Sequence, residues 1–235
     1  MKLQTSITGV LVTGKSIERF PLAHRAVQAW LQQRYPGDRE LLIINDHPTE
    51  SLYTSDPPAG VREIRIPERF TLGALRNMGI KHASHEYIIQ WDDDDFSGSN
   101  RLSWQVAHTR EGRASIFRYE VHCNLFTGEA FVNDGDIIRC HGFPGTMLWP
   151  RATVCQFPDQ GTKEDTEFVL NLASVRGVDI LDNDPLLYCR FFTGNNTWSE
   201  KHIMTRKPGA RDLSNDERMY VQQLLTQTQQ FLTRP

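Results

Sequence analysis

The chain has 235 residues, of which 39% are hydrophobic and 23% charged, a composition typical of a globular protein with a sizeable core. Its formal net charge of −3 argues against general nucleic-acid binding, because neutralising phosphates requires clustered Lys and Arg. No apolar run is long enough to cross a bilayer, and no signal-peptide core follows Met1. We therefore expect a cytoplasmic protein with at most peripheral membrane contact.

The first hundred residues alternate between strand-like and helix-like segments. Short apolar or alternating runs predict strands, and Pro21 and Thr71 suit the starts of two helices. The predicted strands cover 7–13, 41–44, 61–66 and 87–89. The first predicted helix runs from Pro21 until Tyr35-Pro36-Gly37 ends it, and the second runs from Thr71 to Gly79. This alternation predicts an α/β fold with a mostly parallel central sheet and flanking helices.

The second half has a different pattern. It predicts a hairpin over 114–132 that turns at Thr127-Gly128, and a further strand over 137–140. A helix over 164–172 follows, and a last amphipathic helix covers 220–232. We expect a small antiparallel sheet here, within a single domain over 1–235, because no linker separates the two halves.

The cysteines lack a CxxC spacing, which favours buried thiols in a reducing compartment over a disulfide framework. The pairs His122-Cys123 and Cys140-His141 invite a zinc interpretation, but neighbouring residues on a strand face opposite sides. The cysteines are Cys123, Cys140, Cys155 and Cys189.

Acidic residues follow two of the predicted strands. Asp46 comes directly after the strand over 41–44, and Asp92 to Asp95 come after the strand over 87–89. Ligands of open parallel sheets bind beyond the carboxyl ends of the strands. Four adjacent carboxylates repel one another unless a positive partner compensates, and Mg²⁺ or Mn²⁺ prefers such oxygens. This placement favours a metal site over the alternative, a solvated acidic loop.

Four stretches of the sequence resemble the family 2 inverting glycosyltransferases of the glycosyltransferase A fold. Asp92-Asp93-Asp94-Asp95, followed by Arg101-Leu102, is similar to the family's Asp-x-Asp-Asp segment, and 75–88 is similar to the stretch that precedes it. Residues 41–49 and 157–168 extend the resemblance, whereas 113–141 matches nothing in the family pattern. The departures are Asn45, His47, His85 and Ser99 in place of the usual Asp, Gly, Gly and Pro.

The resemblance implies a metal-dependent inverting transfer from a nucleoside-diphosphate sugar, commonly a UDP-sugar, to an acceptor hydroxyl. It implies a nucleotide-sugar-binding half over 1–102 and an acceptor-facing half over 103–235, which holds the C-terminal loop and helix. A glycan, a lipid-linked glycan, a protein or another hydroxyl compound can be the acceptor. The alternatives are a nucleotidyltransferase or pyrophosphorylase acting on sugar phosphates, whose Gly-rich basic loop is absent, and a catalytically inactive binding module.

The resemblance also assigns roles in the aspartate cluster. Asp94 is expected to ligate Mn²⁺ or Mg²⁺ directly. Asp92 is expected to support the metal through water or to hold the donor's ribose or sugar. Asp95 either orients the sugar hydroxyls or caps the following helix. Asp93 is grouped with the donor-binding residues, although strand-like alternation directs its side chain away.

Three further residues are assigned to the donor. Asp46 is expected to accept a hydrogen bond from the nucleobase, with an Asx-type turn bond as its alternative. Thr13 ends the first strand and is a candidate for lining the same base pocket. Arg76 either meets a phosphate with its fork of donors or forms a structural ion pair.

The acceptor chemistry is assigned to Glu164 and Asp165. Asp165 matches the family's general base, and Glu164 is expected to support it or to bind acceptor. The alternative is that both merely favour the helix N-terminus. His202 is a candidate metal ligand or diphosphate contact, with an ordinary surface histidine as the alternative. The polar segment 192–211 is expected to be mobile without ligand and to close over the donor diphosphate, with Trp198 or His202 reaching inward.

Overall fold

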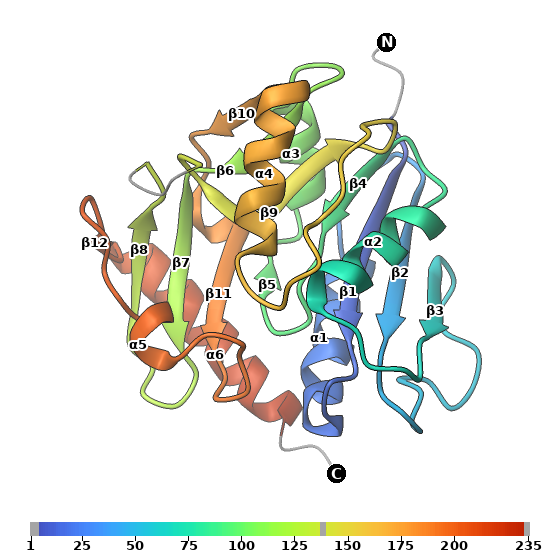
Figure 1. Cartoon of the computed structure of the whole chain (residues 1–235). Coiled ribbons are helices and arrows are strands. Elements are labelled where there is room, and N and C mark those ends of the chain that lie inside the picture. Colours follow the sequence, from blue (N-terminus) through green and yellow to red (C-terminus); the bar gives the residue numbers. More distant parts are fainter. Residues whose placement is uncertain (1–4, 137–139, 233–235) are drawn as a thin grey trace.

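The computed structural model describes residues 5–136 and 140–232, which form two β-sheets with helices on their faces (Figure 1). The helices are η1 (Ile17–Arg19), α1 (Phe20–Leu31), α2 (Leu72–His82), α3 (Arg101–His108), α4 (Glu164–Val175), η2 (Pro185–Leu187), α5 (Glu200–Ile203) and α6 (Asn215–Leu232). The strands are β1 (Ile7–Thr13), β2 (Arg39–Asn45), β3 (Val61–Arg65), β4 (Tyr87–Gln90), β5 (Phe96–Ser97), β6 (Ala114–Phe117), β7 (Tyr119–Asn124), β8 (Ala130–Asp134), β9 (Phe143–Pro150), β10 (Val178–Leu181), β11 (Tyr188–Phe192) and β12 (Arg211–Asp212).

The larger sheet has the strand order β10-β6-β9-β4-β1-β2-β3. All neighbouring pairs are parallel except those of β9, which runs antiparallel to both β4 and β6. The mostly parallel sheet predicted from the alternation is confirmed. Because β1, β2 and β4 are mutually parallel neighbours, their carboxyl ends lie at one edge of the sheet.

Helices cover both faces of the larger sheet (Figure 1). On one face, α1 and α3 pack on side chains such as Leu11 and Ile89, and Trp30 lies in this layer. On the other face, α2 and α4 pack on side chains such as Leu42 and Trp149. The close contact of α2 requires glycine, because a Cβ at Gly79 would lie 2.3 Å from Val10 Cγ1.

The smaller sheet has the order β12-β8-β7-β11-β5. Its pairs are antiparallel except β7 with β11, so the predicted small antiparallel sheet contains one parallel pair. One face packs on α6 through an apolar cluster that includes Val121, Phe191 and Leu224. The opposite face carries buried polar side chains, among them Glu120 and His122.

Some element boundaries differ from those predicted. The segment 114–132 is not a single hairpin, because β6 pairs within the larger sheet and only β7 and β8 turn at Thr127-Gly128. The last helix begins earlier than predicted, because Ser214 accepts a hydrogen bond from Glu217 N, 3.3 Å away, and so caps it. The strand predicted over 137–140 lies largely outside the described residues.

The four cysteines are free thiols, and all but the half-buried Cys155 are buried. His122 and Cys123 face opposite sides of β7, which agrees with the argument against a zinc site. Among the described residues, no helix is long and apolar enough to span a membrane.

Candidate functional site

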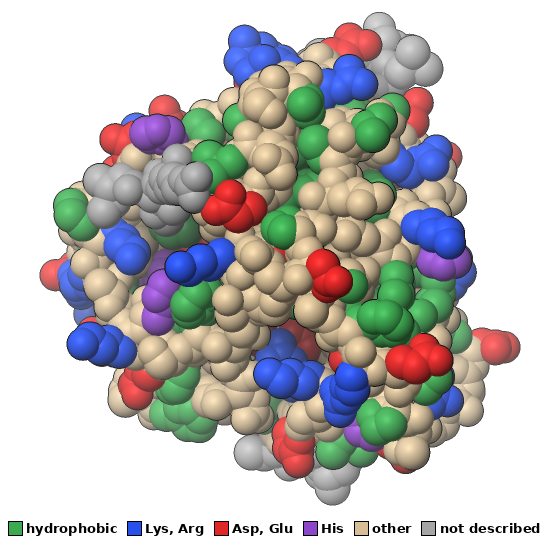
Figure 2. Space-filling model, viewed as in Figure 1, with side chains coloured by type: hydrophobic (Ala, Val, Ile, Leu, Met, Phe, Trp, Pro, Cys, Tyr) green, Lys and Arg blue, Asp and Glu red, His purple; other side chains and the backbone are tan. Residues whose placement is uncertain are grey.

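A cavity of about 330 Å³ opens at the carboxyl ends of β1, β2 and β4. Its other walls are the N-terminus of α4, strand β11 and the segment that follows β11. Figure 2 shows this recess below the centre of the face, with Lys and Arg side chains around an acidic interior. Every predicted donor-binding and catalytic residue lines it: Thr13, Asp46, Arg76, Asp92, Asp93, Asp94, Asp95, Glu164 and Asp165.

Asp93 is fully paired within the protein. Its Oδ2 accepts hydrogen bonds from Thr13 Oγ1, at 2.8 Å, and from Arg19 Nε, at 2.9 Å. Arg19 Nη2 also binds the other carboxylate oxygen. Burial lowers the pKa of Arg19, but the charges of Asp93 and Asp94 outweigh burial and raise this pKa above its ordinary value. In this geometry Asp93 binds Arg19 rather than turning away from the cavity, as strand alternation predicted.

Asp94 has one oxygen engaged by the protein. Its Oδ2 lies 3.1 Å from Arg19 Nη2 and accepts a hydrogen bond from Asn196 Nδ2 at 2.9 Å. No described residue donates a hydrogen bond to Oδ1. Burial, more than the neighbouring carboxylates, raises the pKa of Asp94.

The donor set around Asp94 fits a hard divalent cation that is shared with a substrate. A carboxylate oxygen is the ligand type that Mg²⁺ and Mn²⁺ prefer. Among the described residues, no three His, Cys, Asp or Glu side chains are grouped as a complete metal site. Mg²⁺ is commonly held by one or two carboxylates together with substrate phosphates and water, so a single available carboxylate suits that mode of binding.

Asp92, Arg76 and Glu164 form a continuous charged row. Arg76 Nη2 lies 3.2 Å from Asp92 Oδ1, and Arg76 Nη1 binds Glu164. Gln90 Nε2 and Tyr188 Oη approach Asp92 at 3.0 and 3.3 Å. Burial lowers the pKa of Arg76, but Asp92 and Glu164 raise it more. The structural ion pair considered for Arg76 is therefore present, on a side chain that also lines the cavity.

Asp95 connects the cluster to the smaller sheet. It accepts hydrogen bonds from Tyr188 Oη at 2.6 Å and from Phe191 N at 3.0 Å. Burial raises its pKa well above the ordinary value. The helix-cap alternative was wrong, because the N-cap residue of α3 is Asn100 and no side chain caps that helix.

Asp46 is free to face the cavity because its neighbour takes the turn bond. Asn45 Oδ1 accepts the hydrogen bond from His47 N at 2.9 Å, so the Asx-type bond considered for Asp46 belongs to Asn45. Asp46 lies 3.5 Å from Arg69 Nη1, and burial raises its pKa.

Glu164 and Asp165 begin α4 after Lys163, whose φ of 64° places it in the left-handed region. The Asp165 carboxylate accepts a hydrogen bond from Thr166 N at 2.6 Å and is half-buried in the cavity wall. Glu164 is only 2% exposed, and burial raises its pKa despite the pairing with Arg76. Of these two acids, only Asp165 lacks a positively charged hydrogen-bond partner among the described residues.

Arg190 on β11 lines the cavity and was not predicted from the sequence. Within the described part of the chain, its guanidinium takes part in no hydrogen bond or ion pair. Burial lowers its pKa, but the charges of Glu120 and Asp95 outweigh burial and raise it. The signal was present in 188–192, where Arg190 is the only charged residue in an otherwise aromatic and apolar strand.

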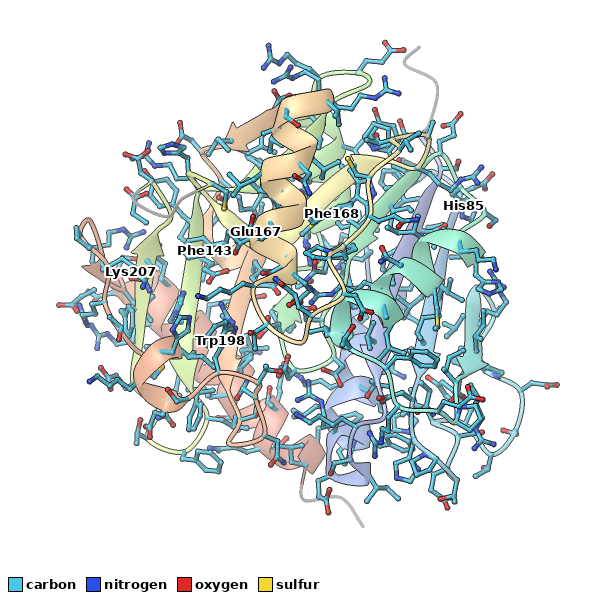
Figure 3. All side chains as sticks on the ribbon, viewed as in Figure 1. His85, Phe143, Glu167, Phe168, Trp198 and Lys207 are labelled. Atoms are coloured by element: carbon cyan, nitrogen blue, oxygen red, sulfur yellow. The ribbon has the colours of Figure 1, made fainter. Side chains whose placement is uncertain are left out.

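His202 does not line the cavity. Its ring stacks on that of Trp198, with the centroids 4.2 Å apart, and it is Trp198 that lines the cavity. Figure 3 shows Trp198 on the segment after β11, near the N-terminal end of α4. Burial, together with Arg190 and Lys207, lowers the pKa of His202. Trp198 therefore presents its ring to the cavity, and His202, which does not line the cavity, stacks on that ring.

The segment 192–211 makes several hydrogen bonds to the rest of the protein. Arg19, Asn124, His122 and Asn133 each bind a group within it. These contacts hold much of the segment against the smaller sheet, and its mobility without ligand stays a prediction. Whether it closes further over a ligand stays a prediction.

Residues 18–126 match the family model described as "Glycosyl transferase family 2". The match includes the aspartate cluster and its preceding stretch, so the family resemblance drawn from these residues is confirmed. No curated protein matches the chain by sequence.

Solved structures of S. aureus TarS share the fold. The structure of TarS 1–349 in complex with UDP-GlcNAc has a TM-score of 0.63 and 12% identity, and the match covers 95% of this chain and 66% of that one. The structure with UDP has a TM-score of 0.58 and 13% identity, covering 84% and 68%, respectively. TarS 1–349 alone has a TM-score of 0.56 and 13% identity, covering 78% and 60%. This chain thus spans less than two thirds of two of these three TarS chains.

Proposed function

We propose that the chain is a metal-dependent inverting glycosyltransferase that moves a sugar from a nucleoside-diphosphate sugar, a UDP-sugar in the first instance, to an acceptor hydroxyl. The observation that carries this proposal is that one cavity is lined both by Asp92 to Asp95, from the first half of the chain, and by Asp165, from the second half. The TarS structures with UDP and UDP-GlcNAc support the choice of donor.

The donor half, residues 1–102, contributes the binding groups for the nucleotide. Asp46 presents a carboxylate toward the cavity from the end of β2 and suits hydrogen bonding to a nucleobase. Thr13 lies next to Asp46 at the end of β1, and its hydroxyl donates a hydrogen bond to Asp93. Asp92 and Asp95 are held rigidly by Tyr188, which suits the orientation of sugar or ribose hydroxyls.

The leaving group of this reaction is a diphosphate, whose developing charge needs compensation. A divalent cation on Asp94, when bound, supplies a counter-charge to the departing phosphate. Arg190 is the second group suited to this task, because its guanidinium lines the cavity and lacks a hydrogen-bond partner among the described residues. Arg76 is less available, since Asp92 and Glu164 occupy its donors.

The acceptor-facing half, residues 103–235, contributes the base. An inverting displacement needs a carboxylate that takes the acceptor proton as the hydroxyl attacks from the face opposite the leaving group. Asp165 suits this role because it lines the cavity and has no positively charged hydrogen-bond partner among the described residues, whereas Glu164 beside it pairs with Arg76. Trp198, backed by His202, supplies an apolar wall that excludes water from the activated sugar.

A donor panel tests the proposal. We expect a UDP-sugar with Mn²⁺ to raise the melting temperature, because a bound ligand stabilises the folded state by mass action. Slow, metal-dependent release of UDP in water should accompany binding. Release of pyrophosphate from a nucleoside triphosphate and a sugar phosphate would instead establish the nucleotidyltransferase activity. The absence of stabilisation by any nucleotide sugar would contradict the donor assignment.

A further inference from the structure

Arg19 lines the cavity but lies in none of the motifs that carry the family resemblance. Its guanidinium contacts three residues. Its Nε and Nη2 bind the two oxygens of Asp93, Nη2 also lies 3.1 Å from Asp94 Oδ2, and Nη1 donates to Asn195 O at 2.7 Å. The side chain is only 12% exposed. A guanidinium held by this many charge-assisted contacts has a defined position.

Asp93 fixes that position. Thr13 donates a hydrogen bond to the Asp93 carboxylate, and the carboxylate in turn binds the Nε–Nη2 edge of the guanidinium through two contacts. The consequence is a positive charge placed beside Asp94, the residue proposed to bind the cation. Asp93 thus fixes the position of Arg19, and the positive charge of Arg19 compensates the mutual repulsion of Asp93 and Asp94.

Arg19 and Asp94 also bind the segment that follows β11. Asn195 accepts the Arg19 hydrogen bond through its carbonyl oxygen, and Asn196 Nδ2 donates to Asp94 Oδ2 at 2.9 Å. The Asn196 amide also binds Phe191 O and Thr193 N, so its orientation is set by its own segment. Any change at Asp94 or Arg19 therefore reaches residues 193–196 directly.

We infer that Arg19 and a divalent cation are alternative partners of Asp94, and that exchanging one for the other loosens the hold on residues 193–196. The physical reason is that a dication and a guanidinium on one carboxylate repel each other strongly at a few ångströms in a site shielded from water. Arg19 is then a positioning residue, which links the charge on Asp94 to the segment bearing Trp198. This inference rests on the proposed metal dependence.

The first test is Mn²⁺ binding without nucleotide, measured by titration calorimetry or by the Mn²⁺ electron-spin signal. Arg19→Gln should bind Mn²⁺ about tenfold more tightly than the wild type, because the competing charge is gone. Arg19→Lys keeps the charge and should stay close to the wild type. Arg62→Gln is the control, since Arg62 lies on β3, pairs with Glu40 and does not line the cavity. Unchanged or weaker Mn²⁺ binding by folded Arg19→Gln would overturn the inference.

The second test is hydrogen exchange in peptides covering 193–198. Mn²⁺ alone should increase exchange there in the wild type, because Asn195 loses its partner. Arg19→Lys should show increased exchange even without metal, since one ammonium nitrogen replaces the separate guanidinium nitrogens that bind Asp93 and Asn195. If Mn²⁺ leaves wild-type exchange unchanged, or changes it equally in Arg19→Gln, the coupling does not exist.

These results separate the inference from the proposed function. Should Mn²⁺ support UDP-sugar turnover while neither test responds to Arg19, only the inference fails. If the wild type and Arg19→Gln bind no Mn²⁺ with or without UDP, the proposed metal dependence fails, and the inference fails with it.

Discussion

The two sides of the cavity differ in how their charged side chains are paired. On the donor side, Asp92 and Asp93 are paired with arginines inside the protein. On the acceptor side, Asp165 is bonded only to its own Thr166, and Arg190 has no hydrogen-bond partner among the described residues. Adjacent carboxylates need a positive partner in both halves, as Glu164 has in Arg76, whereas Asp165 and Arg190 keep charges that a ligand can meet. Under the proposed function, this difference suits rigid donor binding on one side and proton transfer on the other.

The largest effect is expected at Asp94, whose Oδ1 accepts no hydrogen bond from a described residue. Asp94→Asn should lower transfer on the order of 10³-fold and weaken donor binding, because the diphosphate loses its counter-charge. Donor turnover with saturating Mn²⁺ and calorimetry with UDP measure the two effects. Full activity of this variant, or of the wild type in chelator, would remove the metal from the mechanism.

Asp165→Asn tests the acceptor side in isolation. Turnover should fall on the order of 10²-fold, while donor and metal affinity stay nearly unchanged, since the base acts on the acceptor alone. Single-turnover kinetics and calorimetry give the comparison. Loss of donor binding together with activity would place Asp165 on the donor side.

Arg190→Gln tests whether the second unpaired charge acts on the substrate. We expect a decrease in turnover of about tenfold or more, because a phosphate contact from a buried guanidinium is charge-assisted. The melting temperature should not fall, since no protein partner is lost. A large fall in melting temperature with unchanged turnover would make Arg190 a structural residue.

His202→Ala is expected to have a smaller effect on activity. Removing the stacked ring should slow turnover about three- to tenfold, because Trp198 loses its support, and should weaken nucleotide binding less. Hydrogen exchange over 192–211 with donor plus Mn²⁺ is the matching measurement. Equal protection with and without donor and metal would reject closure of the segment.

Asp179→Asn, outside the cavity, should leave turnover unchanged and lower stability. Burial raises the pKa of Asp179, but Arg110 and Arg113 outweigh burial and bring it down to about 2. A lowered folded-state pKa stabilises the protein above the unfolded value of 3.8, and this stabilisation disappears as the pH falls through about 2. Denaturant unfolding should show a loss of about 2 kcal/mol at pH 7 that vanishes at the acid end. A pH-independent loss would attribute the effect to packing.

The sequence by itself determined the four parallel strands β1 to β4 of the larger sheet and the location of the site. Apolar runs such as 7–13 and 41–44 are buried on both faces, so each of these strands can be predicted from its local run of apolar residues. The carboxyl ends of parallel strands lie at one edge of the sheet, and that rule alone brings Asp46 together with Asp92 to Asp95. The resemblance to the family supplied Glu164 and Asp165, which no periodicity would have brought to the same cavity.

Only the tertiary structure decided how the charges pair. Arg19, Asp93 and Asn195 are far apart in the chain, and nothing in their local sequence indicates that they meet. The same holds for Arg190, whose strand joins the smaller sheet through a parallel pairing with β7. Ion pairs and cavity walls depend on distances between elements, which packing sets after the elements have formed. Sequence patterns therefore located the cavity, and the packing of η1, α4 and β11 around it determined which charges are paired there and which are available to a substrate.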